Sequence, residues 1–165
     1  MSEYVTKPLD ASTWDAFGRL AEKHNGMGFG GCWCTWFHSR EGRPEGEKGR
    51  PWKERLVREG DAHAALVFDG NAAVAWCQFG SPEELPDYRL TCIFVDRDYR
   101  RKGVAGVALR GALELIAEAG GGVVEGYPQD TQGKKISAKF LYNTTRSLYE
   151  QTGFCLLYTS PSPRD

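Results

Sequence analysis

One short segment of the chain combines residue types that could bind a phosphate group. Residues 93–106 read IFVDRDYRRKGVAG, which predicts a strand ending near Val95 and a helix beginning near Gly103. Such a turn points several unpaired backbone N–H groups, and the positive end of the helix dipole, at one place, where phosphates bind. The small residues that leave room near the backbone, and the cations that add charge, are Gly103, Ala105, Gly106, Arg100, Arg101 and Lys102.

Two widespread phosphate-binding patterns do not account for this segment. The P-loop pattern G-x-x-x-x-G-K-[ST] and a complete G-x-G-x-x-G are both absent from the chain. For the segment alone, an ordinary solvated helix start with basic residues in its turn stays open as the alternative.

Two blocks together resemble the GNAT (GCN5-related N-acetyltransferase) superfamily. R-x-x-G-x-A at residues 100–105 matches the superfamily's Q/R-x-x-G-x-G/A signature, and Y-x-x-x-G-F at residues 149–154 resembles its characteristic helix end. The blocks follow in the superfamily's order. The resemblance implies an α/β (α+β) class and the GNAT-like acyl-CoA N-acyltransferase fold, with a mixed central sheet flanked by about four helices. It also implies acetyl-CoA as co-substrate.

Carried over position by position, the resemblance implies a role for each part of the donor site. Backbone groups near Phe94 and Val95 would pair with the pantetheine arm of CoA as an added strand does. Tyr149 would lie near the thioester sulfur. The superfamily often has Asn seven residues before this Tyr, but the chain has Tyr142 at that position. Asn143, one residue further along the chain, is expected as the CoA contact instead. The backbone N–H groups that would hold the pyrophosphate belong to Arg101, Lys102, Gly103, Val104, Ala105 and Gly106, with Arg100 at the head of the loop.

Direct acetyl transfer needs a neutral amine, a donor for the oxyanion and an acid for the departing thiolate. The N–H of Val95, at a strand end, could stabilise the oxyanion. Tyr149 could donate to the sulfur, because a tyrosine with a reference pKa of about 10 keeps its proton at neutral pH. The alternative for Tyr149 is a helix residue packed under the sheet. The base is open among Glu125, Asp130, Asp96 and His38, and Glu125 is the catalytic candidate named with Tyr149.

The resemblance places the acceptor site in the region after the first helix, here residues 25–50. This glycine-rich loop carries Trp33, Trp36 and Phe37, which could form an apolar wall or a cage for a cationic amine. The alternative is a loop whose aromatic side chains pack into the core. Residues 128–140 are a plausible second wall or lid. Polyamine, amino acid, aminoglycoside and protein N-terminus all stay open as acceptors.

Hydrophobic periodicity predicts the elements that would position these residues. Ser12-x-x-Asp15 is a capping box that opens a helix reaching about His24. Apolar runs at 62–68 and 72–79, separated by Asp-Gly-Asn, predict a hairpin. The remaining expectations are strands at about 3–9, 89–95 and 123–127, and helices starting near Pro51, over about 105–116, and over about 143–152. The strand–helix–strand unit in the middle should be parallel.

Composition bounds the possible functions. The chain has 165 residues, 41% of them hydrophobic and 26% charged, with a formal net charge of −1, as expected for one globular domain. A nearly neutral chain lacks the field that would hold it on nucleic acid or an acidic membrane. No signal region or membrane-length apolar run occurs, which favours the cytoplasm. The five cysteines indicate free thiols, and their spacing predicts no metal site.

The end of the chain has an unusual sequence. Residues 155–165, CLLYTSPSPRD, resemble the in-frame translation of a common sequencing adapter. The N-acetyltransferase domain is therefore predicted to cover residues 1–154, with a non-native tail at 155–165 and a truncated C-terminal strand; the native residues after Phe154 are then unknown. A genuine short Pro-rich tail is the alternative.

These observations predict an N-acetyltransferase that moves an acetyl group from acetyl-CoA to a primary amine by direct transfer. The acceptor is a small-molecule or protein amine, with no nucleic acid or membrane partner, and the protein is a monomer or homodimer. Two alternatives are kept. One is a catalytically silent CoA-binding or sensor domain of the same fold. The other is a non-enzymatic interaction domain that uses the loop of Trp33 and Trp36 and exposes an apolar patch.

Overall fold

The computed structural model describes most of the chain. The described residues are 3–24, 33–35, 38, 44–80, 88–131 and 143–156. Trp36, Phe37 and Tyr142 of the sequence predictions lie outside them, as do residues 157–165 of the predicted tail.

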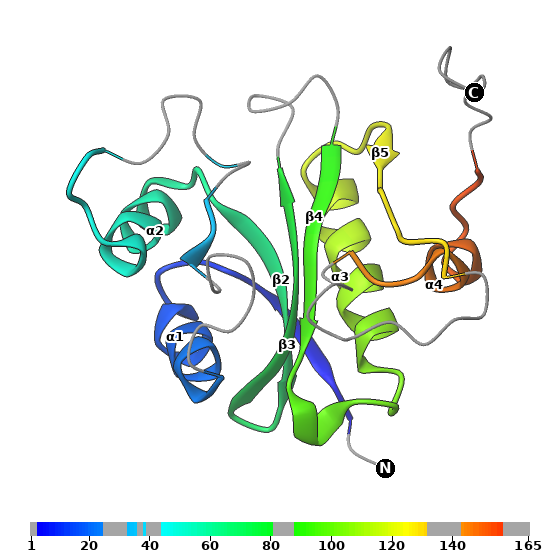
Figure 1. Cartoon of the computed structure of the whole chain (residues 1–165), viewed down its shortest axis with the longest axis horizontal. Helices are drawn as coiled ribbons and strands as arrows, with labels where there is room; N and C mark the ends of the chain where they lie inside the picture. The colour runs from blue at the N-terminus through cyan, green and yellow to red at the C-terminus, as the bar shows by residue number, and fades with distance from the viewer. Residues whose placement is uncertain are drawn as a thin grey trace.

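A five-stranded mixed sheet forms the centre of the molecule, with its strands in the order β1-β2-β3-β4-β5 (Figure 1). The first four strands pair antiparallel, whereas β4 and β5 pair in parallel across helix α3, which confirms the predicted strand–helix–strand unit. The strands are β1 Val5–Pro8, β2 His63–Asp69, β3 Ala72–Gly80, β4 Tyr88–Val95 and β5 Val124–Glu125.

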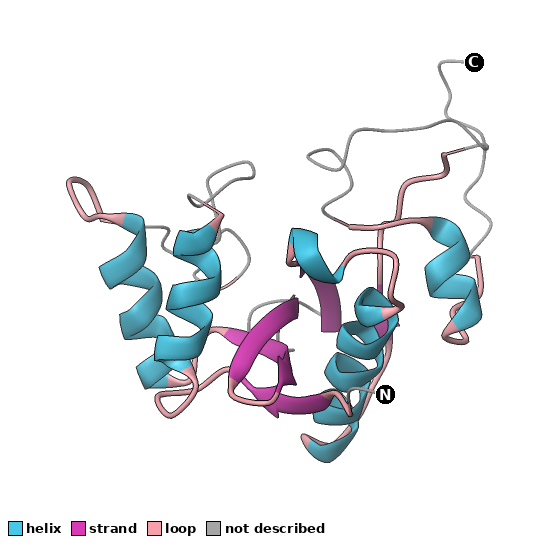
Figure 2. Ribbon diagram, turned by 90° about the horizontal axis from the view of Figure 1, so that it is seen from below, coloured by secondary structure: helices cyan, strands magenta, loops and turns pink. Residues whose placement is uncertain are grey.

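Helices cover both faces of this sheet (Figures 1 and 2). Helices α1 (Trp14–Lys23) and α2 (Gly49–Glu59) lie on one side. Helices α3 (Val104–Glu118) and α4 (Arg146–Gln151) lie on the other, and the short 3-10 helix η2 (Arg97–Tyr99) joins β4 to α3. This arrangement confirms the predicted mixed sheet with about four flanking helices.

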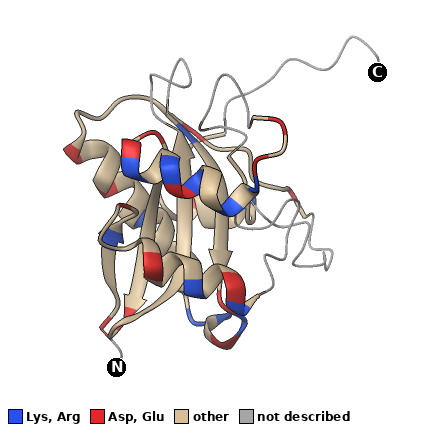
Figure 3. Cartoon of the chain, turned by 90° about the vertical axis from the view of Figure 1, so that its left-hand side faces the viewer, with Lys and Arg blue, Asp and Glu red and all other residues tan. Residues whose placement is uncertain are grey.

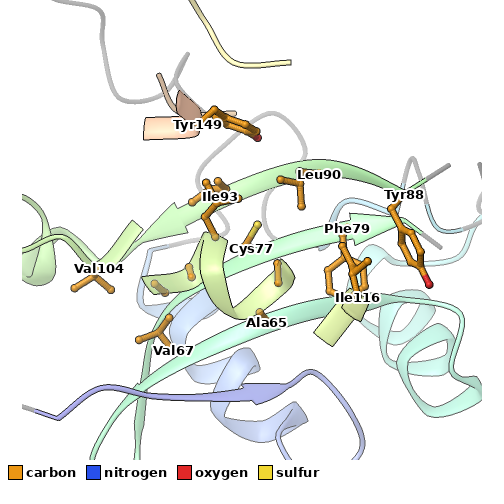
Figure 4. Packing of buried hydrophobic residues seen from close by; sticks show 14 of the residues in the cluster. Ala65, Val67, Cys77, Phe79, Tyr88, Leu90, Ile93, Val104, Ile116 and Tyr149 are labelled. Carbon is orange, nitrogen blue, oxygen red and sulfur yellow. The ribbon is translucent and has the colours of Figure 1, made fainter. Parts of the chain in front are cut away.

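Strand alternation divides the core in two. Along β3, Trp76 packs with α1 and α2, and its neighbour Cys77 packs with α3, because successive side chains of a strand point to opposite faces. The α3 side gathers Ile93, Ile116 and Tyr149 in one cluster (Figure 4). Basic and acidic positions are interspersed along both α1 and α2, so neither helix carries charges of one sign only (Figure 3).

Several boundaries match the sequence predictions, and two elements are shorter. The 62–68/72–79 hairpin is confirmed, with Gly70 and Asn71 between β2 and β3. The strand predicted at 123–127 is reduced to the two residues of β5, and the last helix begins at Arg146 instead of near Asn143. Both shortened elements border the candidate site, where the chain leaves the sheet.

The predicted capping box at Ser12 and Asp15 is wrong. The N-cap of α1 is Thr13, which makes no side-chain cap bond. Its hydroxyl instead donates to the Pro8 carbonyl at 2.7 Å. The Asp10 carboxylate accepts from the N–H groups of Ser12 and Thr13, at 2.8 and 3.2 Å. The polar groups before α1 therefore stabilise the reversal between β1 and the helix, in competition with the cap.

Candidate active site

The turn between β4 and α3 leaves a run of backbone amides without acceptors. The N–H of Tyr99 donates to the Asp96 carbonyl, and those of Gly106 and Val107 donate to the Gly103 carbonyl. The N–H groups of residues 100–105 have no acceptor among the described residues. Arg101 and Gly103 have positive φ angles of 61° and 76°, which turn the backbone where α3 begins. The result is a concave set of donors at the positive end of a helix.

Cations surround these amides. Arg100, Arg101 and Lys102 are exposed, and the first turn of α3 contains no acidic residue. Arg110 approaches from the next turn: an ideal Cβ placed on Gly106 would lie 3.4 Å from an Arg110 guanidinium nitrogen. The side chains of a helix lean toward its N-terminus, and the missing side chain of Gly106 leaves the room that Arg110 occupies. The turn is thus locally basic although the chain is nearly neutral.

Asp96 anchors the turn to α1. Its carboxylate accepts from Lys23 Nζ at 2.6 Å and from the N–H of Asp98 at 3.1 Å. The side chain is almost fully buried. Burial raises the pKa of Asp96, but the hydrogen bonds from Lys23 and the Asp98 N–H more than offset this, so the pKa lies below its usual value. These partners make Asp96 a structural carboxylate, and of the predicted base candidates it is the one bound to a lysine.

One edge of β4 has no partner strand beyond its first residues in the described part of the chain. There, β5 pairs with β4 only at Tyr88 and Arg89. The N–H of Asp96 donates to the Val74 carbonyl of β3 at 2.8 Å. Because antiparallel pairs alternate between bonded and non-bonded, the N–H and C=O groups of Ile93 and Val95 point away from β3, toward the side that β5 has left. The Val95 carbonyl lies 3.5 Å from Arg100 Nε on that side.

A bulge at Thr91 lies within the same stretch of β4. Cys92 is opposite Gln78 of β3, whereas Leu90 is opposite Phe79, so Thr91 is the extra residue. The bulge explains why Leu90 and Ile93, three positions apart, both face α3. It changes the direction of the strand beside its open edge, between the paired end at Arg89 and the turn at Asp96.

Tyr149 extends from α4 toward this edge (Figure 4). The residue is 2% exposed, and its ring packs against Phe154 with 4.9 Å between ring centroids. The ring also lies against the backbone of Gly126, the residue that follows β5. Its hydroxyl is buried and has no hydrogen-bond partner among the described residues. Burial, with the nearby thiols of Cys77 and Cys92, raises the pKa of Tyr149, so the hydroxyl keeps its proton.

Glu125 lies at the point where the two strands separate. Its carboxylate accepts from Tyr127 Oη at 3.0 Å and is 3.4 Å from an Arg89 guanidinium nitrogen. The Arg89 guanidinium also stacks on the Tyr127 ring, 4.8 Å from its centroid. Among the other base candidates, Asp130 is paired with Arg146 at 3.6 Å, and His38 is buried beside Gln78. Glu125 borders the end of the open edge at Arg89, whereas Asp96 at the other end is bound by Lys23.

The α1 and α2 side holds the part of the predicted acceptor region that the structure describes. Trp33 packs against Trp14 and Phe17, with centroid distances of 5.8 and 5.9 Å, as the core-packing alternative expects. Beside it, Lys53 of α2 is fully buried and donates to Gln78 Oε1 at 2.8 Å. Lys53 was not among the residues predicted from the sequence.

Asn143 precedes α4 and is half-buried. Its Oδ1 is buried and has no partner among the described residues. The position is near the start of the helix that carries Tyr149, which fits the expected CoA contact without testing it.

Within the described part of the chain, no group of three His, Cys, Asp or Glu side chains is placed to hold a metal ion. No helix among the described residues is long and apolar enough to cross a membrane.

A family model described as "Acetyltransferase (GNAT) family" matches residues 21–136, which include β4, the basic turn and α3. The chain belongs to this family. The match confirms the resemblance drawn from the blocks at residues 100–105 and 149–154, although the second block lies outside the matched residues. The chain therefore has the GNAT fold and belongs to a family of acetyltransferases.

Solved structures show the same fold at low sequence identity. A ribosomal-protein-alanine N-acetyltransferase from Brucella melitensis biovar Abortus 2308 has a TM-score of 0.56 and 18% identity, over 99% of this chain and 100% of that one. The aminoglycoside acetyltransferase AAC(6')-Iy, in complex with a bisubstrate analogue of CoA, has a TM-score of 0.58 and 12% identity, over 98% and 100% of the two chains. The ribosomal-protein-S18-alanine N-acetyltransferase from Escherichia coli has a TM-score of 0.52 and 12% identity, over 92% and 77%. A search of curated proteins found no match.

Proposed function

We propose that this GNAT protein transfers an acetyl group from acetyl-CoA directly to a primary amine. The observation that carries the proposal is the run of open amides at residues 100–105, continuous with the open edge of β4 and next to a buried, protonated tyrosine. Each part matches a need of the reaction: the amides precede α3, the open edge belongs to β4, and the tyrosine comes from α4.

The donor site is proposed to follow this geometry. The amides of residues 101–105 and the cations around them bind the pyrophosphate of CoA, with Arg100 at the head of the loop. The N–H of Gly106 already donates to the Gly103 carbonyl at 3.0 Å, so it contributes less. The pantetheine arm pairs with the outward N–H and C=O groups of β4 near Phe94 and Val95, as an added strand would. Asn143 contributes a further amide group.

The transfer step is proposed to use groups along the open edge of β4. The amine nitrogen attacks the thioester carbonyl; a C–N bond forms, and the C–S bond then breaks. The outward N–H groups of β4, those of Ile93 and Val95, stabilise the negative charge on the carbonyl oxygen. Tyr149 donates its proton to the departing thiolate and regains one from solvent. Glu125 takes the proton released by the amine, directly or through a water molecule.

Two other functions compete with this proposal. An interaction domain that uses exposed tryptophans is disfavoured at Trp33, which is half-buried and packs against Trp14 and Phe17; Trp36 lies outside the described residues. A silent CoA-binding domain of the same fold shares the donor site and differs only in turnover. The buried hydroxyl of Tyr149 favours the enzyme, because an unpartnered buried polar group lowers stability and needs another reason to persist.

Donor binding is tested by a thermal-shift measurement with acetyl-CoA. A ligand that binds only the native state raises the melting temperature, here expected for the unaltered protein. Gly103→Glu should abolish the shift by placing a carboxylate among the phosphate-binding amides. Gly60→Glu is a matched control, because both glycines have positive φ angles, 76° and 84°, and open space where a side chain would go. An equal acetyl-CoA shift in Gly103→Glu and Gly60→Glu would contradict the donor site.

Turnover separates the enzyme from the silent domain. Release of free CoA thiol from acetyl-CoA is followed over a panel of primary amines. An acetyl-CoA shift without turnover of any amine in the panel would favour the silent CoA-binding domain.

A further inference from the structure

A cluster of three side chains, Arg89, Glu125 and Tyr127, stands where β4 and β5 separate. All three contact one another: Tyr127 Oη donates to Glu125 at 3.0 Å, and Arg89 approaches both the Glu125 carboxylate and the Tyr127 ring. Unlike the core around it, the cluster is open to solvent, with side-chain exposures of 30% for Arg89 and 36% for Glu125. It is a preformed polar surface at the end of the open edge.

Strand geometry places this cluster on the face of the sheet that α1 and α2 cover. Leu90 and Tyr88 face the α3 side, so Arg89 between them points to the other face. Glu125 is the register partner of Arg89 and shares that face. The proposed acid, Tyr149, lies on the opposite side against Gly126, the next residue after Glu125. A thioester in the open edge would thus have the leaving-group acid on one side and the cluster on the other.

The charges on this face are unusual for a site that binds polycations. Glu125 is the single carboxylate of the cluster, and Arg89 stands beside it. A second cation, Lys53, is buried on the same face and donates to Gln78 of β3. Gln78 is two residues from Gly80, the residue of β3 that lies opposite Arg89. An ammonium group can bind Glu125, but a second positive group close by on the acceptor would meet the Arg89 guanidinium. An anionic or carbonyl oxygen there would instead meet a guanidinium.

We propose that Arg89, Glu125 and Tyr127 bind the acceptor, and that the acceptor carries a carboxylate or carbonyl oxygen on the carbon next to its amine. Free α-amino acids and peptide N-termini share this head group. Glu125 and Tyr127 hold the amine, and Arg89 binds the neighbouring oxygen. This inference rests on the acetyltransferase function proposed above and narrows its acceptor to one class.

The test compares three acceptors at saturating acetyl-CoA: alanine, its amide, and spermidine, with kcat/KM as the readout. Alanine and alaninamide should exceed spermidine at least tenfold, because each forms one charge-assisted hydrogen bond with Arg89 that spermidine cannot form. The two alanine derivatives distinguish the sources of the head group. A preference for alanine indicates a free amino acid, and equal or better use of alaninamide indicates a peptide N-terminus.

Variants of the cluster show whether it is the cause. Arg89→Gln should raise the KM for alanine about tenfold and leave the KM for acetyl-CoA unchanged. Arg58→Gln is the control, because Arg58 also pairs with a glutamate, Glu54 at 2.8 Å, on the exposed surface of α2. If Arg89→Gln has a lower melting temperature than the Arg58→Gln control, Tyr127→Phe serves as a second variant. It keeps the exposed ring and removes only the hydroxyl.

The outcomes separate this inference from the function on which it rests. Spermidine turnover equal to or above that of alanine, or an alanine KM that neither cluster variant changes, would overturn the inference and leave the acetyltransferase intact. An acetyl-CoA shift with no turnover of the three acceptors also overturns it. Absence of both the shift and turnover would overturn the proposed function itself.

Discussion

The placement of Tyr149 depends on a glycine, and replacing that glycine tests the site directly. An ideal Cβ on Gly126 would overlap the Tyr149 ring, whose Cδ1 and Cζ atoms would be 2.9 Å away. The ring cannot turn aside easily, because the residue is 2% exposed and packs against Phe154. Gly126→Ala should therefore push Tyr149 out of position or bend the chain after β5.

The size of the effect follows from the packing. Forcing one methyl group into a filled site costs about 1–3 kcal/mol. Removing the ring should remove that cost: in a Tyr149→Ala background, Gly126→Ala should change stability by less than about 0.5 kcal/mol. The two substitutions should thus show a coupling energy of about 1–3 kcal/mol, since the residues are in contact.

Urea unfolding of the four proteins, wild type, two single variants and the double variant, measures this coupling. Acetyl-CoA turnover measured alongside should show a lower kcat for Gly126→Ala with an unchanged melting shift for the donor. Equal destabilisation by Gly126→Ala in both backgrounds would refute the packing argument. Wild-type kcat in Gly126→Ala would refute the placement of Tyr149 at the reaction centre.

Three further predictions concern single positions. Tyr149→Phe should lower kcat at least tenfold with little change in donor affinity. Because burial raises the pKa of Tyr149, the wild-type kcat should show no loss from ionisation of this hydroxyl up to about pH 10. A fall in kcat below that pH that Tyr149→Phe abolishes would contradict this. Asp96→Asn should cost about 1–2 kcal/mol at neutral pH, measured by urea unfolding. Because the folded-state pKa of Asp96 lies below its usual value of 3.8, its stabilisation is present above that pH and is lost as the pH falls below it, so the wild-type and Asn proteins should converge in acid. Gly111→Ala should cost about 1–3 kcal/mol by thermal melting, because its Cβ would overlap Thr6 of β1; a change under about 0.5 kcal/mol would show that β1 can move away.

The parts of the fold with strong local signals were predictable from the sequence. The apolar periodicity of α3 and the Asp-Gly-Asn turn between β2 and β3 both led to elements that the structure confirms. The basic turn before α3 was also identifiable, because its glycine and cations are contiguous in the chain. The role of each residue in that turn stays a prediction.

The features that depend on long-range pairing were not predictable. Val123 to Tyr127 has the composition of a longer strand, but β5 pairs with β4 at only two positions before the chain leaves the sheet. The capping box failed for a similar reason: Ser12 and Asp15 have the right spacing, yet Asp10 is better placed after the reversal from β1. Lys53 had a detectable signal, since it lies three and four positions before the buried Leu56 and Val57 on one helical stripe.

The short pairing of β4 with β5 links the donor and acceptor sides of the site. Had β5 continued beside β4, the N–H and C=O groups of Ile93 and Val95 would be bonded within the sheet, and no edge would remain for a pantetheine arm. The chain leaves at Gly126, where the Tyr149 ring lies against the backbone and a side chain would not fit. One glycine thus permits both the open edge and the position of the proposed acid. The residue just before it, Glu125, is then left at the end of the split, facing the opposite side of the sheet from Tyr149. For this reason a substitution at position 126 should affect chemistry more than donor binding, which is proposed to use the turn before α3.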